Sequence, residues 1–156
     1  MRAGRRGKGK RPTVAPVVGK NGGTSYKLAP EYEEEMQQNI IKATKLMKYK
    51  DETVFDYIHH TPNGGVRDEI EGAKFKRMGV KAGYPDLSLD IITKHYAGLR
   101  IELKRGELGT TDGKQKIVLD RLNNEGYYAV ICNTMEMAID IIKRYVLGYK
   151  LETPII

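Results

Sequence analysis

The sequence is poor in several features, and each scarcity excludes a class of protein. Its 156 residues include one cysteine, Cys132, so no disulfide can form within the chain, and we expect a reducing, intracellular setting. No apolar run approaches the roughly 20 residues that a membrane-spanning helix needs, so we expect no contact with a membrane. The basic N-terminus lacks the apolar stretch of a secretory signal. What is present, 40% hydrophobic residues, is enough for one domain with a core.

Acidic residues are missing from the first 30 positions, which hold eight of the chain's 27 lysine and arginine residues. The other 19 nearly balance the 20 acidic residues, so the net charge of +7 belongs to this segment. Its scattered glycines and prolines argue against a helix. We therefore predict a basic, disordered arm at residues 1–30 that is attracted to a polyanion such as nucleic acid. A solubilising tail without a partner is the alternative.

Apolar periodicity predicts alternating helices and strands in the rest of the chain. Helices are expected at 31–49, 112–124 and 134–146, with a helical or irregular segment at 67–78, and strands are expected at 53–59, 86–93, 99–104 and 127–132. The short link at 95–98 predicts that the strands beside it pair as an antiparallel hairpin. The order indicates an α/β fold, a mixed β-sheet flanked by helices, at residues 31–150, followed by a tail at 151–156.

Two acids and a lysine stand on the predicted hairpin. Asp86 opens its first strand, and Glu102 and Lys104 are two residues apart on the second strand, so they share one face. If Asp86 lies across from Glu102, two carboxylates and an ammonium converge. Carboxylates can hold the divalent cation that phosphodiester hydrolysis uses, and a nearby lysine can stabilise charge or orient water. The opposite face carries three apolar residues expected to be buried: Leu99, Ile101 and Leu103.

A solvated strand face is the competing interpretation. Alternating charges occur on any half-exposed strand, and Glu102-Leu103-Lys104 alone favours that simpler reading. When Pro85-Asp86, at a distance compatible with a hairpin, is also considered, the catalytic site and the solvated strand face are equally supported.

Six sequence blocks, in order, carry a resemblance to a known family. They are Glu33-x-x-x-Gln37, residues 60–65 (HTPNGG), residues 76–87 (KRMGVKAGYPDL), residues 98–104 (GLRIELK), Lys114-Gln115 and Leu122-x-x-x-Gly126-Tyr127. From about residue 33 to 145 the chain resembles a stand-alone VRR-Nuc domain, a branch of the PD-(D/E)XK nuclease superfamily. The resemblance implies a restriction-endonuclease-like fold.

The resemblance also implies roles for residues. Asp86, Glu102 and Lys104 match the core motif, and Gln115 matches a glutamine on the helix after the catalytic strands. Glu33 matches an additional acid on the first helix, and sharing a helix face with Gln37 favours it over Glu34. Mg²⁺, with Mn²⁺ as a substitute, is then expected on Glu33, Asp86, Glu102 and the backbone carbonyl of Leu103.

Six further residues are candidate contacts to nucleic acid: His60, Asn63, Lys76, Arg77, Lys81 and Lys114. Each has a structural alternative. His60 stands at the end of a predicted strand, Asn63 suits a turn, and the basic side chains between 74 and 81 can form a solvated helix face balanced by acids.

The expected function is that of a metal-dependent DNA endonuclease. The resemblance implies a homodimer that nicks branched DNA of the Holliday-junction type, and a phage protein that acts in the host cytoplasm. Three alternatives stay open. They are a non-catalytic DNA-binding module with a nuclease fold, an RNA-processing nuclease, and an inert domain whose basic arm does all the binding.

Overall fold

The computed structural model describes residues 14–18, 24–28, 33–61, 69–105, 112–152, 154 and 156. The chain divides into two units, Met1–Pro30 and Glu31–Ile156. In the first unit, β1 (Val14–Val18) pairs antiparallel with β2 (Thr24–Leu28). The disorder predicted for residues 1–30 is thus wrong for these two strands, where β-branched valines favour extended backbone and the intervening Asn21-Gly22 sequence is typical of hairpins.

The second unit contains helices and strands in a mixed order. Its elements are α1 (Glu33–Thr44), β3 (Lys48–Tyr49), β4 (Glu52–Thr53), a 3₁₀ turn η1 (Val54–Tyr57), β5 (Ile58–His60), α2 (Glu69–Arg77), β6 (Leu87–Leu89), β7 (Leu99–Leu103), α3 (Gly113–Asn124), β8 (Tyr128–Cys132) and α4 (Met135–Val146). Among the described residues, no helix is long and apolar enough to cross a membrane.

A four-stranded sheet in the order β5-β6-β7-β8 forms the centre of this unit. β6 is antiparallel to β5 and to β7, which confirms the predicted hairpin, and Leu87 pairs with Ile101. β7 and β8 are parallel, and such a pair needs a crossover connection, which contains α3. The sheet is therefore mixed, as the sequence predicts.

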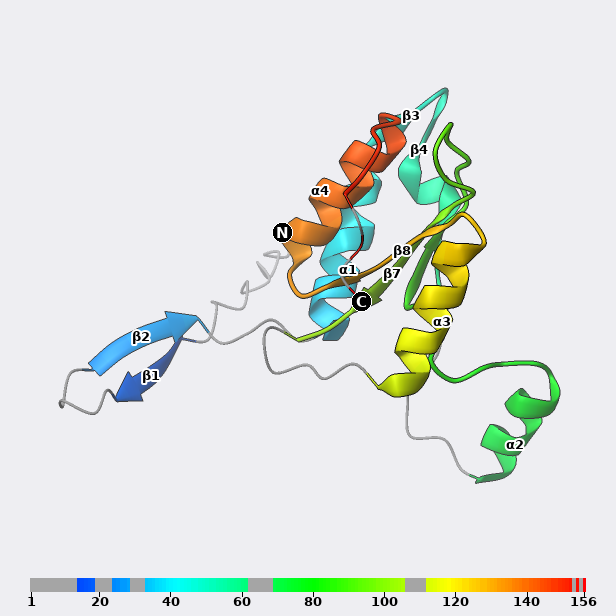
Figure 1. The fold of residues 1–156 in the computed structure, drawn as a ribbon. Coiled ribbons are helices and arrows are strands. Elements are labelled where there is room, and N and C mark those ends of the chain that lie inside the picture. Colours follow the sequence, from blue (N-terminus) through cyan, green and yellow to red (C-terminus); the bar gives the residue numbers. More distant parts are fainter. Residues whose placement is uncertain are drawn as a thin grey trace, which may run out of the picture. The chain divides into compact units, whose positions relative to one another are not determined.

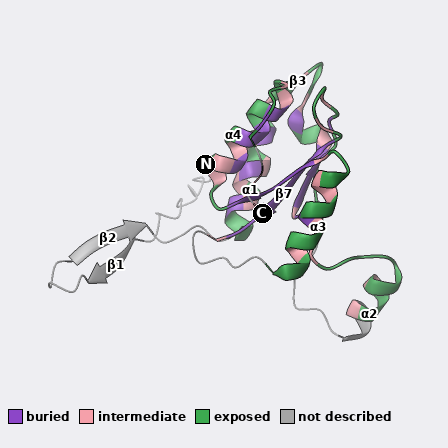
Figure 2. Cartoon of the chain, in the orientation of Figure 1, coloured by how far each residue is buried: buried purple, intermediate pink, exposed green. Residues whose placement is uncertain are grey.

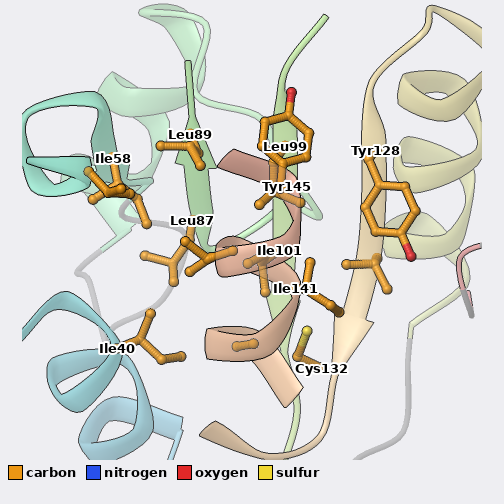
Figure 3. Packing of buried hydrophobic residues seen from close by; sticks show 14 of the residues in the cluster. Ile40, Ile58, Leu87, Leu89, Leu99, Ile101, Tyr128, Cys132, Ile141 and Tyr145 are labelled. Atoms are coloured by element: carbon orange, nitrogen blue, oxygen red, sulfur yellow. The ribbon is translucent and has the colours of Figure 1, made fainter. Parts of the chain in front are cut away.

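Helices cover both faces of the sheet (Figure 1). α1 and α4 pack together on one face, where Leu99, Ile101 and Leu103 join the main core cluster (Figure 3). α3 packs on the other face, where Leu119 meets residues of β8. As a result all five residues of β7 are buried, and the strand is purple throughout in Figure 2. The half-exposed strand considered from the sequence is wrong, because α3 shields the face that carries the charges.

Two predicted helix starts are confirmed by their caps. The Asp112 carboxylate accepts a hydrogen bond from the backbone of Lys114 at the start of α3. The Thr134 hydroxyl accepts one from the backbone of Met137, 3.1 Å away, at the start of α4. These bonds satisfy backbone donors that a helix start leaves without an intrahelical partner.

The single strand predicted at 53–59 is wrong. The Asp56 carboxylate accepts hydrogen bonds from both the backbone and the hydroxyl of Thr53, at 2.9 and 2.7 Å. This local bonding competes with strand pairing and winds Val54–Tyr57 into a 3₁₀ turn, so β5 begins only at Ile58. The strand predicted at 86–93 is likewise shorter, since β6 ends at Leu89.

Candidate active site

Asp86 lies one residue before β6, directly after the buried Pro85. Continuing the β6–β7 register by one residue places it opposite Glu102. Its Oδ2 atom accepts a hydrogen bond from the backbone N–H of Leu103 at 2.9 Å. This bond ties the carboxylate to the end of β7, where the motif residues of that strand lie.

Glu102 is the most buried charged side chain of the site, with 2% of its surface exposed. The Lys104 ammonium donates to its Oε1 atom at 2.8 Å, and the Gln115 amide nitrogen donates to the same oxygen. The other end of the Gln115 side chain accepts a hydrogen bond from the backbone of Asp112 at 3.0 Å. Gln115 therefore connects the first turn of α3 to the strand carboxylate.

Glu33 approaches the same region from the first turn of α1. Its carboxylate accepts a hydrogen bond from the backbone N–H of Arg105, 3.0 Å away and just beyond β7. The neighbouring Glu34 instead accepts from Gln38 on its own helix, at 3.3 Å. Of the two acids weighed from the sequence, Glu33 is the one that contacts the strand side of the site.

Burial governs the electrostatics of the two strand carboxylates. Burial, partly offset by the hydrogen bond from Lys104, raises the pKa of Glu102 to about 7. Burial also raises the pKa of Asp86 above its usual value, against the lowering effects of the Leu103 N–H and of Lys104. The negative charge of Glu33 reinforces both shifts, and that of Asp86 reinforces the shift of Glu102. A raised pKa means that the surroundings do not fully stabilise the negative charge of the ionised carboxylates. A bound cation would therefore stabilise the ionised form.

The donor chemistry fits a hard divalent cation. Within the described ranges, no three histidine, cysteine, aspartate or glutamate side chains cluster closely enough to hold a metal. Mg²⁺ does not require such a cluster, because one or two carboxylates with waters and substrate oxygens complete its octahedron. Asp86, Glu102 and a backbone carbonyl of this strand end are oxygen donors of that kind.

The chain is similar to a solved structure described as "VRR_NUC domain protein". The two share 39% identity with a TM-score of 0.70, over 81% of this chain and 98% of that chain. The chain belongs to the VRR-Nuc family. No family model matches the sequence, and no curated protein does either. The family and the restriction-endonuclease-like fold predicted from the sequence are thus confirmed, and the chain is a nuclease-fold domain of a family that acts on DNA.

The predicted nucleic-acid contacts of this VRR-Nuc domain lie in three places. The His60 Nδ1 atom is 2.9 Å from the Asp86 carbonyl oxygen, beside the site, while Asn63 lies outside the described residues. Lys76, Lys81 and Lys114 are exposed and line one hollow. Arg77 is exposed at the end of α2 but does not line that hollow. The roles of all six as contacts remain predictions.

Asp112 is connected to the site through Gln115, and this connection is not apparent from the sequence. The pattern Asp112-x-x-Gln115 is a capping box, in which each residue satisfies a backbone donor of the other. That pattern is visible in the sequence and identifies Gln115 as bound to the helix start. What the sequence does not reveal is that the free end of the Gln115 amide meets Glu102.

Arg100 is the other unexpected feature of the VRR-Nuc domain. Its guanidinium is buried, forms an ion pair with Asp90 at 3.0 Å, and lies 4.6 Å from the centre of the Tyr127 ring. It also donates to the carbonyl of Leu99 at 2.9 Å. Arg100 is thus on the same face of β7 as Glu102 and anchors the end of the strand farther from the site.

Proposed function

We propose that this VRR-Nuc domain is a Mg²⁺-dependent DNA endonuclease that nicks branched DNA, with Mn²⁺ as a substitute metal. The observation that carries the proposal is the convergence of Asp86, Glu102 and Lys104 at one end of β7. Keeping two carboxylates desolvated beside a lysine costs folding free energy, and such arrangements are typical of functional sites.

The metal would be held by Asp86, Glu102 and the Leu103 carbonyl, with Glu33 assisting. When bound, a divalent cation supplies charge neutralisation at the phosphate and activation of a water molecule. The Lys104 ammonium, fixed 2.8 Å from Glu102, places a positive charge where the phosphate charge develops or orients the attacking water. Gln115 fixes the Glu102 carboxylate and, through it, the geometry of the oxygen donors.

The preference for branched DNA and the assembly into a homodimer follow from the family resemblance. A two-fold symmetric pair of sites matches a junction, in which two strands of the same polarity are exposed together. Sedimentation velocity of the free protein tests the dimer, and a monomer at micromolar concentration would contradict it.

The test compares wild type with Glu102→Gln and Lys104→Met. Each is incubated with linear, nicked and four-way DNA of one sequence and with an RNA hairpin, in Mg²⁺ and in EDTA. We expect wild type to nick four-way DNA only with the metal, and both variants to lose at least about a hundredfold in rate while retaining binding. Lys143→Ala, an exposed lysine of α4 on the opposite face of the sheet, is the matched charge control.

Each other outcome rejects a specific part of the proposal. Wild-type rates in Glu102→Gln would reject the site. Equal cleavage of all DNA substrates would reject selectivity for branches. Cleavage of RNA in preference to DNA would favour the RNA-processing alternative, and metal-independent binding without cleavage would favour a non-catalytic module.

A further inference from the structure

A hollow of about 560 Å³ lies between the end of α2 and the start of α3. Figure 1 shows α2 set apart from the sheet, on the side of the N-terminal end of α3. We call this the α2 hollow, and its lining residues are Gly72, Phe75, Lys76, Gly79, Val80, Lys81, Ala82 and Lys114. Its volume is within the range of sites that hold one small ligand.

The lining combines two kinds of surface. The three charged residues in it are all lysines, Lys76, Lys81 and Lys114, and each is exposed. The remaining lining is apolar or glycine, with the half-buried Phe75 ring and the Val80 side chain among it. Cations together with an aromatic ring are the combination that binds single-stranded nucleic acid, because the cations track phosphates and the ring stacks on a base.

The turn that ends α2 gives the hollow its shape. Gly79 has φ +91°, a left-handed conformation that L side chains rarely adopt. The N–H of Gly79 donates to the carbonyl of Lys76, and the N–H of Val80 donates to the carbonyl of Phe75, at 3.1 and 3.0 Å. These are the two bonds of a Schellman motif, and they bring the chain back over the last turn of the helix. The backbone around the hollow is therefore built by hydrogen bonds rather than by an open loop.

The α2 hollow shares a wall with the candidate active site. Lys114 lines the hollow, and the next residue, Gln115, donates a hydrogen bond to Glu102. On the second segment of this wall, Ala82 lines the hollow, and the next residue, Gly83, packs directly on the backbone of Lys114 and Gln115. Two consecutive residues on each segment thus separate a ligand in the hollow from the buried carboxylates.

We infer that the α2 hollow binds an unpaired nucleotide of the DNA substrate next to the phosphodiester bond that is cut. The inference rests on the proposed function, and it narrows the substrate class to duplex DNA with unpaired nucleotides at the cleavage point. Bases within a continuous duplex are stacked on each other and expose only their edges in the grooves, so their faces cannot reach an apolar lining behind lysines. An unpaired nucleotide supplies both the phosphate and the exposed base face that this lining matches.

Gly72 offers a way to fill the hollow with little disturbance to the helix. A Cβ atom added there meets no atom within 4 Å, and leucine and alanine are both better helix formers than glycine. Gly72→Leu therefore occupies space in the hollow, and Gly72→Ala occupies less of the same space. Ala82→Leu fills the hollow from the facing segment, and Phe75→Ala removes the ring.

The experiment uses the full chain with Glu102→Gln as the background, so that DNA is bound without being cut. Fluorescence anisotropy gives the affinity for a blunt duplex and for a fork of the same length with an unpaired oligothymidine arm. We expect Gly72→Leu, Ala82→Leu and Phe75→Ala each to lose about tenfold or more in affinity for the fork. Their affinities for the duplex should stay within about twofold of the background. Gly72→Ala, which adds only one methyl group, should lose less affinity for the fork than Gly72→Leu does. Lys143→Ala should stay within about twofold of the background for both DNAs.

An equal loss for fork and duplex would overturn the inference, because the hollow would then be a general phosphate contact. The inference would also be overturned if none of the three variants lost affinity for the fork. The two proposals fail separately. If wild type cleaves nothing with Mg²⁺ while the fork-specific loss holds, the nuclease function fails and the binding site stands. If wild type nicks four-way DNA while Gly72→Leu binds the fork as tightly as the background does, the function stands and the hollow site fails.

Discussion

The side-chain amide of Gln115 bonds at both ends, with its nitrogen donating to the Glu102 carboxylate and its oxygen accepting from the backbone of Asp112. One residue thus joins the cap of a surface helix to the most buried acid of the site. An amide held at both ends loses its rotational freedom on folding, so Glu102 meets a fixed donor rather than a mobile one.

Replacing Gln115 by alanine is expected to lower the nicking rate by about 10- to 100-fold, the usual effect of losing a partner that orients a metal ligand. Single-turnover nicking of four-way DNA at saturating Mg²⁺ measures it. Asp112→Ala is the control for helix stability. It removes the carboxylate that accepts from the Lys114 backbone, but it keeps the backbone N–H of residue 112 that donates to the Gln115 side chain. A rate loss as large in Asp112→Ala as in Gln115→Ala would show that the effect comes from the helix start alone.

The stability of the metal-free protein should depend on pH through Glu102. Its pKa is raised from 4.5 to about 7, so between these values the folded state binds the proton more tightly than the unfolded state. Stability is therefore gained at low pH and lost as pH rises through this window, by roughly 3 kcal/mol at about 1.4 kcal/mol per pKa unit. Urea unfolding in EDTA at several pH values measures the slope.

Glu102→Gln removes this titration, so the same unfolding experiment on the variant should give a flatter profile and a more stable protein above pH 7. The activity of wild type should rise over the same range, because binding of the cation requires the ionised carboxylate. Identical pH profiles for wild type and variant would contradict the assignment of the raised pKa to this residue.

Gly83→Ala is expected to destabilise the domain more than Gly79→Ala. Both glycines have positive φ, +81° and +91°, so both substitutions carry the cost of a left-handed alanine, roughly 1 kcal/mol. Only at Gly83 does the added Cβ come within 3.2 Å of backbone atoms, those of Lys114 and Gln115. The difference in unfolding free energy between the two variants isolates this contact. Equal losses would show that the close approach of the two segments is not energetically important.

The basic segment at residues 1–30 is expected to contact phosphates. Changing its six basic residues before Pro12 to glutamine should lower the affinity for DNA, and the effect should shrink as salt rises. The plot of log affinity against log salt should become shallower by about 0.9 for each duplex phosphate contact that is lost. An unchanged slope would favour the solubilising tail, and changing six exposed lysines elsewhere to glutamine is the control for net charge.

Much of the site was predictable because local and sheet geometry determine it. The period of two along a strand is enough to place Glu102 and Lys104 together, and the hairpin register places Asp86 opposite Glu102. The sequence patterns also locate the caps of α3 and α4, since a capping side chain acts within three residues.

The long-range features were not predictable from these patterns. Nothing in the alternation along β7 tells that α3 covers its charged face, so the burial of Arg100 and Glu102 was missed. The 3₁₀ turn at Val54–Tyr57 depends on the hydrogen bond between Asp56 and Thr53. This bond forms although the composition of the segment favours a strand. The hairpin of β1 and β2 is hidden in the sequence, because the glycines and basic residues around it are typical of a disordered segment although its valines favour a strand.

The bond between the Asp86 carboxylate and the backbone of Leu103 has a practical consequence. An amide proton that points at a carboxylate has an NMR resonance that responds to the charge on that carboxylate. The Leu103 amide is therefore a built-in reporter for Asp86, and the Arg105 amide is one for Glu33. Two cross-peaks of a single ¹⁵N-labelled sample, followed through a titration with protons or Mg²⁺, would show which of these acids loses a proton or gains an ion first.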